Sequence, residues 1–164
     1  IMLWQGLHIR YIRTILKSAV NEVVDEIKKL QQENGVNLRN IIVDEDGVGG
    51  GVKDYLRCQG FTNNARPIKG ENYQNLKTQC YYKLADQINK GQIGVSCSDV
   101  NVKNYITEEL EQVRTKDADK DNKLQIIQKD TVKAILGRSP DYADALAMRM
   151  FYEIDSNFGR YFVQ

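Results

Sequence analysis

The sequence predicts an α/β domain with a mixed sheet, and three observations support this. Short β-branched apolar runs alternate with longer segments whose apolar residues recur every three or four positions. Strands that alternate with helices in this way are typical of α/β domains. The 164 residues contain no internal repeat and no Pro/Gly/Ser-rich linker, and a chain of this length can bury a core of its own. We therefore expect one domain over residues 1–164.

The first expected elements are a hairpin, a helix and a buried strand. Residues 1–13 have two short apolar stretches around Gly6, which predicts a β-hairpin. Residues 16–35 carry apolar side chains at helical spacing and end at Gly35, where a left-handed cap would close the helix. Residues 40–44, NIIVD, form a continuously apolar run between polar residues, and we expect a central strand covered on both faces.

The glycine-rich segment that follows predicts a second helix. Residues 50–60, GGVKDYLRCQG, read as a helix closed by Gly60. Residues 65–70, ARPIKG, read as a short strand whose pairing is limited by Pro67.

The second half of the chain continues the alternation of helices and strands. A long helix is expected from about Tyr73 to Asn89, where its apolar residues fall on one stripe. The elements expected after it are a strand at 92–96, a helix at 102–115, an exposed strand at 123–129 and an apolar-rich helix at 141–154.

The overall charge gives the protein no global attraction to nucleic acid or membranes. Its 23 basic and 22 acidic residues leave a net charge of +1. Between Lys53 and Lys90, however, seven basic residues stand against three acidic ones, which suggests a local side that faces a polyanion. No apolar run approaches the roughly 20 residues that span a bilayer, and the N-terminus lacks the layout of a signal peptide. We expect a soluble, intracellular protein with no membrane partner.

The cysteines and the histidine predict no catalytic or metal role of their own. Cys58, Cys80 and Cys97 are odd in number and widely spaced, which argues against a disulfide framework and against a zinc site. His8 is the only histidine and falls in the predicted hairpin, where a structural role is expected. A Ser-His-Asp or Cys-His hydrolase mechanism would need this histidine, so we set that class aside.

The segment IIVDEDGVGGGVKDYL places an acidic residue at the carboxyl end of the expected central strand. As a phosphate-binding loop it fails, because it lacks the Gly-Lys-Ser/Thr ending, and Val52 stands where a dinucleotide fingerprint needs its third glycine. The glycines instead allow a sharp turn and close packing of the next helix on the sheet. Asp44 then lies at the sheet edge where ligands of α/β folds bind.

A second acidic constellation lies in SPDYADALAM. Pro140 suits a first helical turn, Ser139 could cap it, and Asp141 and Asp144 would share one helix face. An isolated aspartate there would simply complement the helix dipole. With Asp44 added, however, three carboxylates form a set of hard oxygen ligands suited to Mg²⁺ or Mn²⁺. Two such ions support phosphodiester hydrolysis, so the residues point to metal-dependent phosphoryl chemistry.

A competing metal interpretation concerns DADKDNKLQIIQ. Asp117, Asp119 and Asp121 match the first ligands of a calcium loop, but Asn122 replaces the glycine and Gln128 replaces the bidentate glutamate. A polar turn before the strand at 123–129 explains the same residues, and we expect such a turn.

Three segments resemble the carboxy-terminal nuclease domain of tailed-phage terminase large subunits. They are IIVDEDGVGGGVKDYL, NYQNLKTQCYYKLADQINKGQI and KLQIIQKDTVKAILGRSPDYADALAMRM, and the resemblance covers nearly the whole chain. It implies a ribonuclease-H-like fold, a mixed central sheet flanked by helices. It also implies an endonuclease that cuts concatemeric double-stranded DNA during genome packaging in the cytoplasm of the bacterial host, with two Mg²⁺ or Mn²⁺ ions.

Carried over residue by residue, the resemblance implies the same acidic site. Asp44 matches the strand-end acid, with Asp46 as its nearest rival, and Asp141 and Asp144 match the helix acids. The resemblance alone does not say which of the two helix acids lies closer to the metal. The D-x-x-D-A-L-A motif also resembles the last metal-binding helix of Holliday-junction resolvases, which leaves a junction nuclease as an alternative.

We expect basic residues to contact DNA, and the resemblance implies protein partners and one further metal ligand. Lys69, Lys77 and Lys133 are expected to contact the DNA backbone. The implied protein partners are the ATPase domain of the same large subunit, the small terminase subunit and the portal. A further metal-binding aspartate would precede the Leu-Trp-x-Gly segment, and this chain begins at Ile1. We therefore expect the start of the first strand and one ligand to be missing, which keeps a catalytically silent DNA-binding or partner-binding module as an alternative.

Overall fold

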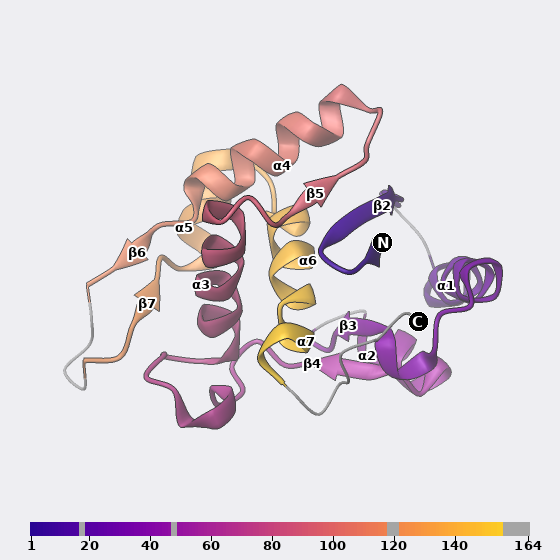
Figure 1. Cartoon of the computed structure of the whole chain (residues 1–164), viewed down its shortest axis with the longest axis horizontal. Helices are drawn as coiled ribbons and strands as arrows, with labels where there is room; N and C mark the ends of the chain where they lie inside the picture. The colour runs from indigo at the N-terminus through magenta and orange to yellow at the C-terminus, as the bar shows by residue number, and fades with distance from the viewer. Residues whose placement is uncertain (17–18, 47–48, 118–121, 156–164) are drawn as a thin grey trace.

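The predicted N-terminal hairpin forms part of a three-stranded mixed sheet in the computed structural model of this chain (Figure 1). Strand β1 (Met2–Gln5) pairs antiparallel with β2 (His8–Ile12), and β2 pairs in parallel with β5 (Gly94–Val95). The structure describes residues 1–16, 19–46, 49–117 and 122–155.

Two smaller sheets complete the strands of these described residues. Strand β3 (Ile42–Asp44) pairs in parallel with β4 (Gln59–Phe61), and β6 (Thr115–Lys116) pairs antiparallel with β7 (Gln125–Ile126). The expectation that β3 lies in the centre of one sheet is therefore wrong, because in the described part of the chain its ladder partner is β4 alone. The apolar run correctly indicated a strand covered on both faces, but burial does not determine which strands pair.

Seven α-helices and two short 3₁₀ helices surround these strands in the described residues. Helix α1 ends where the sequence predicts, because Gly35 adopts a left-handed conformation with φ of +62° that caps the helix. The helices are α1 (Val20–Asn34), α2 (Gly49–Leu56), α3 (Leu76–Asn89), α4 (Val100–Gln112), α5 (Lys129–Leu136), α6 (Asp141–Arg149) and α7 (Phe151–Ile154), with η1 (Leu38–Asn40) and η2 (Ile68–Gly70).

Two predicted boundaries are wrong, and tertiary contacts explain both. Gly60 does not close a helix: α2 ends at Leu56, and Gly60 lies inside β4 opposite Val43. Residues 65–70 form no strand, and the last three of them form the 3₁₀ turn η2. There the buried side chain of Gln79 on α3 bonds the N–H and the C=O of Ile68, at 2.8 and 3.0 Å, and so takes the place of a neighbouring strand.

Two apolar clusters lie on either side of β3. The larger one joins the β1–β2–β5 sheet to α3, α4, α6 and α7, and Ile9, Cys80 and Met150 are fully buried in it. The smaller one joins α1 and α2. Ile42 packs against the larger cluster and Val43 against the smaller, so the prediction that both faces of this strand are covered is confirmed.

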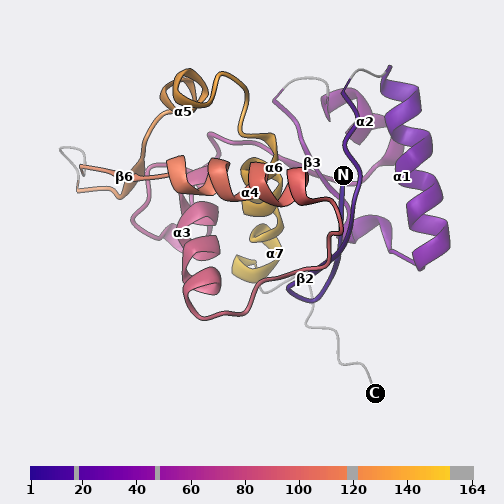
Figure 2. The same cartoon turned by 90° about the horizontal axis from the view of Figure 1, so that it is seen from above.

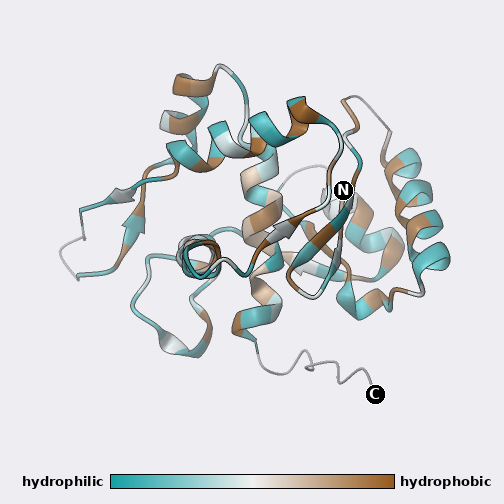
Figure 3. Ribbon diagram, turned by 45° about the horizontal axis from the view of Figure 1, so that its top comes forward, coloured by the Kyte–Doolittle hydropathy of each residue, from teal (hydrophilic) through white to brown (hydrophobic). Residues whose placement is uncertain are grey.

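The arrangement of the helices follows from these clusters. In Figures 1 and 2, α1 and α2 lie at one end of the molecule and the β6–β7 pair at the other, with α3 and α6 packed together between them. The helices show both hydrophilic and hydrophobic residues along their length, as expected when one face of each is buried (Figure 3). None of the described helices is long and apolar enough to cross a membrane.

Cys58 and Cys80 are buried, Cys97 is half-buried, and His8 lies at the start of β2. All three cysteines are free thiols, and burial raises the pKa of Cys80 to about 12. His8 Nε2 and Ser96 Oγ are hydrogen-bonded at 2.7 Å, which links β2 to the segment after β5.

Candidate active site

Asp144, the fourth residue of α6, is held by three side chains from two other helices. The phenol of Tyr81 on α3 donates a hydrogen bond to its Oδ1 at 2.6 Å, and Lys77 Nζ on the same helix lies 2.7 Å from that oxygen. Lys129 Nζ, at the start of α5, lies 2.7 Å from Oδ2. Because the side chain of Asp144 is only 12% exposed, these partners replace most of its contact with water.

These contacts determine the charges at the centre of the site. Burial alone would raise the pKa of Asp144, but Lys77, Lys129 and Tyr81 together bring it below its ordinary value of 3.8. Burial raises the pKa of Tyr81 well above 10.0, so its hydroxyl stays protonated and donates. Asp144 is therefore an anion paired with two ammonium groups at neutral pH.

Lys129 connects Asp144 to the other predicted acids. Burial lowers the pKa of Lys129, but attraction to Asp144, Asp141 and Asp44 outweighs burial and raises this pKa above 10.5. Strand β3, which ends at Asp44, packs against α6, and Asp141 is the exposed first residue of α6. The three aspartates, up to a hundred positions apart in sequence, thus act on one ammonium group.

Asn63 orients the two rival aspartates that follow β3. Its Nδ2 donates to Asp44 Oδ1 at 3.0 Å and to Asp46 Oδ2 at 2.7 Å, and its backbone N–H donates to the same oxygen of Asp46 at 2.9 Å. Asp44 also accepts the N–H of Asp46 at 3.0 Å. Asp44 is half-buried and interacts with Lys129, whereas Asp46 is exposed, so this geometry favours Asp44 as the strand-end ligand.

The close approach of α2 to β3 explains one of the glycines beside Asp44. A Cβ at Gly49 would overlap the backbone carbonyl of Asp44. Only glycine permits helix α2 to start this close to the strand end. The predicted packing role of the glycine segment is confirmed at this position, while Gly47 lies outside the described residues.

The carboxylates do not form a ready-made metal cage. In the ranges that the structure describes, no three acidic, histidine or cysteine side chains lie close enough together to hold one ion. The donor chemistry nevertheless fits Mg²⁺ or Mn²⁺, because the site offers carboxylate oxygens, and Asp144 already binds cations through both of its oxygens. The residues that could hold such an ion are Asp44, Asp141 and Asp144, whose charges all act on Lys129.

The sequence predicted a DNA contact for Lys77, whereas in the structure this lysine pairs with Asp144. Lys129, the second lysine that pairs with Asp144, was not predicted. A signal was present, because both lysines lie in the first turn of a helix, where a positive charge opposes the helix dipole. A lysine in the first turn of a helix is unfavourable unless an anionic group lies close to it, so its presence there indicates such a partner. Lys69 on η2 and Lys133 on α5 are exposed. A role in DNA binding stays a prediction for all three predicted lysines.

Two further expectations concern the flanks of the site. Ser139 is not the cap of α6: the capping position is Pro140, and no side chain of its own caps the helix. Of the calcium-loop residues, Asp119 and Asp121 lie outside the described residues, in the segment between β6 and β7.

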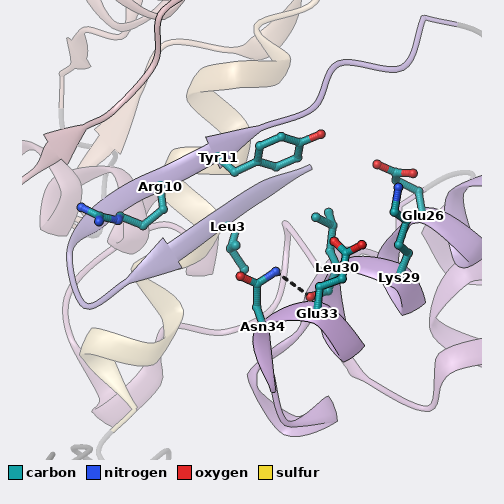
Figure 4. Close-up of a pocket in the computed structure, with 8 residues that line it drawn as sticks. All are labelled: Leu3, Arg10, Tyr11, Glu26, Lys29, Leu30, Glu33 and Asn34. Carbon is teal, nitrogen blue, oxygen red and sulfur yellow. Dashed lines mark hydrogen bonds between the residues drawn. The ribbon is translucent and has the colours of Figure 1, made fainter.

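Of two cavities in the described residues, the smaller one is lined by Asp144 and the larger one by none of the predicted acids. One of about 20 Å³ is lined by Lys77, Tyr81, Lys129 and Asp144 together with apolar side chains, and its volume suits one water-sized occupant. The other, about 290 Å³, lies between the N-terminal hairpin and α1 (Figure 4). None of the predicted site residues lines the larger cavity, whose lining includes both basic and acidic side chains. The lining residues are Leu3, Arg10, Tyr11, Glu26, Lys29, Leu30, Glu33 and Asn34.

Solved structures with the same fold come from the large terminase subunit of a bacterial virus. The nuclease domain of the large terminase subunit gp2 of bacterial virus Sf6 is similar to this chain, with a TM-score of 0.74 and 24% sequence identity over 88% of this chain and 78% of that one. No family model and no curated protein sequence matches the chain.

Metal-containing structures of the same viral domain are similar to this chain as well. A lysine-to-alanine variant with manganese has a TM-score of 0.74 and 23% identity, and covers 88% of this chain and 79% of that one. A lysine-to-alanine variant with calcium has the same TM-score, identity and coverage of this chain, and 78% of its own length is matched. The resemblance to terminase nuclease domains, and with it the ribonuclease-H-like α/β fold, is confirmed at the level of the fold.

Proposed function

We propose that this protein is a divalent-metal-dependent endonuclease that cuts double-stranded DNA. One observation carries the proposal: Asp144 binds two cationic groups, and one of them also interacts with Asp141 and with Asp44 from a distant strand. The fold supports it, since similar solved structures are nuclease domains that contain manganese or calcium.

Each acid has a distinct part in this proposal. Asp44, fixed by Asn63, and Asp144, fixed by Tyr81, are the inner ligands, and the exposed Asp141 is the third acid. When bound, two Mg²⁺ or Mn²⁺ ions would activate a water molecule and stabilise the leaving oxygen of the phosphodiester. The Asn63 and Tyr81 hydrogen bonds keep both carboxylates in place while the lysines move.

The two lysines compete with the metal for Asp144. Each ammonium lies 2.7 Å from a carboxylate oxygen and so occupies an oxygen that would otherwise bind the metal ion. Lys129 is 41% exposed and can turn toward solvent more easily than Lys77, which is 17% exposed. A DNA phosphate offers the displaced ammonium a new anionic partner, so metal and substrate favour each other.

The similar structures, which are nuclease domains of a viral large terminase subunit, support a proposal for the biological setting. We propose that the substrate is concatemeric viral DNA during genome packaging, in the cytoplasm of a bacterial host. The ATPase domain of a large terminase subunit, the small subunit and the portal are the proposed partners. Lys69 on η2 and Lys133 on α5, which are both exposed, are proposed to contact the DNA backbone.

Nicking of supercoiled plasmid DNA in Mn²⁺ or Mg²⁺ tests the activity. The wild-type chain should nick, and Asp44→Asn and Asp144→Asn should each reduce the rate by about 100-fold or more, because each removes a ligand charge. Asp86→Asn is the matched control, since Asp86 pairs with Lys90 on the surface of α3 and should not affect nicking. Equal rates for all four proteins would refute the proposal.

A module that binds DNA without cutting it is the second candidate. The observation that favours this candidate is the pairing of Asp144 with two lysines in place of a metal cage. Such a module would shift DNA in a gel without nicking it, and Asp144→Asn would not weaken the shift.

A further inference from the structure

Helix α6, which carries Asp141 and Asp144, has no cap in its own sequence. The first N–H groups of any helix lack partners within the helix and need acceptors from elsewhere. Serine, threonine, aspartate or asparagine usually provides one, but the capping position here is Pro140, which makes no side-chain bond. The N–H of Asp144 donates to the carbonyl of Pro140 at 3.0 Å. The N–H groups that need an acceptor from elsewhere are therefore those of residues 141–143.

Glu109 on α4 provides the missing acceptor. Its Oε2 accepts the N–H of Ala143, the third residue of α6, at 2.8 Å. The nearby N–H of Tyr142 also favours the charged form of this carboxylate and so works against the rise in its pKa. A glutamate from another helix thus does what a capping side chain would do.

The location of Glu109 is unfavourable for α4 itself. The residue is fully buried, and removal of a carboxylate from water costs free energy unless it is paired and bonded. It also lies in the last turn of α4, where a negative charge opposes the helix dipole. The compensating interactions come from other elements, namely the α6 amides and the guanidinium of Arg138, which pairs with Oε1.

We propose that Glu109 is a positioning residue for the acidic site, and that it sets the carboxylates of Asp141 and Asp144 by capping α6 from α4. The proposal rests on the proposed function, since it assigns these carboxylates to a metal. Asp141 and Asp144 lie in the turn that Glu109 caps, one on each side of the bonded Ala143. Fraying of this turn would separate Asp144 from Asp44.

The adjacent Glu108 offers a matched control. Both glutamates pair with Arg138, Glu108 at 3.3 Å, but the α6 amide is bonded to Glu109. Glu108 is 57% exposed, whereas Glu109 is fully buried. Replacement of Glu108 therefore perturbs the ion pair while it keeps the cap.

Three variants and two readouts test the proposal. Hydrogen exchange at the N–H of Ala143 reports the cap, and titration of Mn²⁺ followed by electron paramagnetic resonance reports the carboxylates. Glu109→Ala should speed the exchange and weaken Mn²⁺ binding by about 10-fold or more, as loss of a ligand-supporting residue typically does. Glu109→Gln keeps an acceptor for Ala143 while Arg138 turns to Glu108, so it should stay within about threefold of wild type. Glu108→Ala should match wild type in both.

The outcomes separate this proposal from the proposed function. Normal exchange or normal Mn²⁺ affinity in a folded Glu109→Ala variant would overturn it, and so would a loss in Glu109→Gln as large as that in Glu109→Ala. Should Glu109→Ala fail to fold, the comparison of Glu109→Gln with Glu108→Ala decides: equal loss of affinity in both would assign the effect to the Arg138 pair and refute the capping role. Wild-type chain that binds Mn²⁺ but cuts no DNA would refute the nuclease and leave the positioning role supported by the binding data.

Discussion

At the scale of single residues, Asp144 has the contacts that matter most for the proposed chemistry. Its two oxygens accept one phenol and two ammonium groups, which come from α3 and α5. These partners favour its charged form more than burial disfavours it, so the pKa is lower in the folded protein than in the unfolded chain. A carboxylate with a lowered pKa is a ready cation ligand, because no proton has to leave before a metal binds.

The lowered pKa predicts how stability changes in acid. A group whose pKa falls on folding stabilises the protein above its unfolded pKa of 3.8, and this contribution is lost as the pH falls through the folded pKa. Asp144→Asn should therefore cost about 1.5–3 kcal/mol in the free energy of unfolding at pH 7, as expected for lost bonds to a charged group. Urea unfolding at pH 7 and pH 3 should show a smaller difference between the two proteins at pH 3. An identical difference at both pH values would show that the lysine pairs do not stabilise the charged form.

At the scale of elements, the segment between β4 and α3 is held by side chains rather than by a sheet. Gln79 is almost fully buried, and its amide bonds both backbone groups of Ile68 and also Glu71. This contact holds η2, and with it Lys69, next to the helix that carries Lys77. The loop that would face DNA is thus fixed to the helix that faces the acids.

Removal of this contact should loosen the loop. Gln79→Ala leaves the N–H and C=O of Ile68 without their partner, which should cost about 2–3 kcal/mol in the free energy of unfolding. Faster hydrogen exchange at the N–H of Ile68 would show that the loop is looser, and a lower urea midpoint would show the loss of stability. Gln87 is a second buried glutamine of the same helix, and its side-chain amide contacts Asp86 at 3.4 Å. Gln87→Ala should leave the hydrogen-exchange rate of the Ile68 N–H unchanged. Equal effects of the two substitutions would contradict the role of Gln79.

The elements also show which features the sequence could predict. Helix α1 and the N-terminal hairpin were predictable because their signals are local, namely a helical apolar stripe ended by Gly35 and two apolar runs around Gly6. The segment at 65–70 was not, because the partner that replaces a strand neighbour is a glutamine side chain further along the chain. Gly60 was misassigned because a glycine after a helix is a common cap, whereas here it pairs with Val43.

At the scale of the whole molecule, the candidate site forms where four distant segments meet. The acids come from the end of β3 and the start of α6, and the lysines come from the starts of α3 and α5. The aspartates were predictable from sequence because each follows a recognisable strand end or helix start. Lys129, Tyr81 and Asn63 were not, because nothing local indicates that they contact these aspartates.

The central claim is that Asp44 and Asp144 share a cation site, and anomalous diffraction from crystals grown with Mn²⁺ tests it most directly. We predict a manganese peak with oxygens of both carboxylates at ligand distance, about 2.0–2.6 Å, and with Lys129 Nζ moved away from Asp144. Peaks that contact only one of the two aspartates, with both lysines still paired to Asp144, would contradict it.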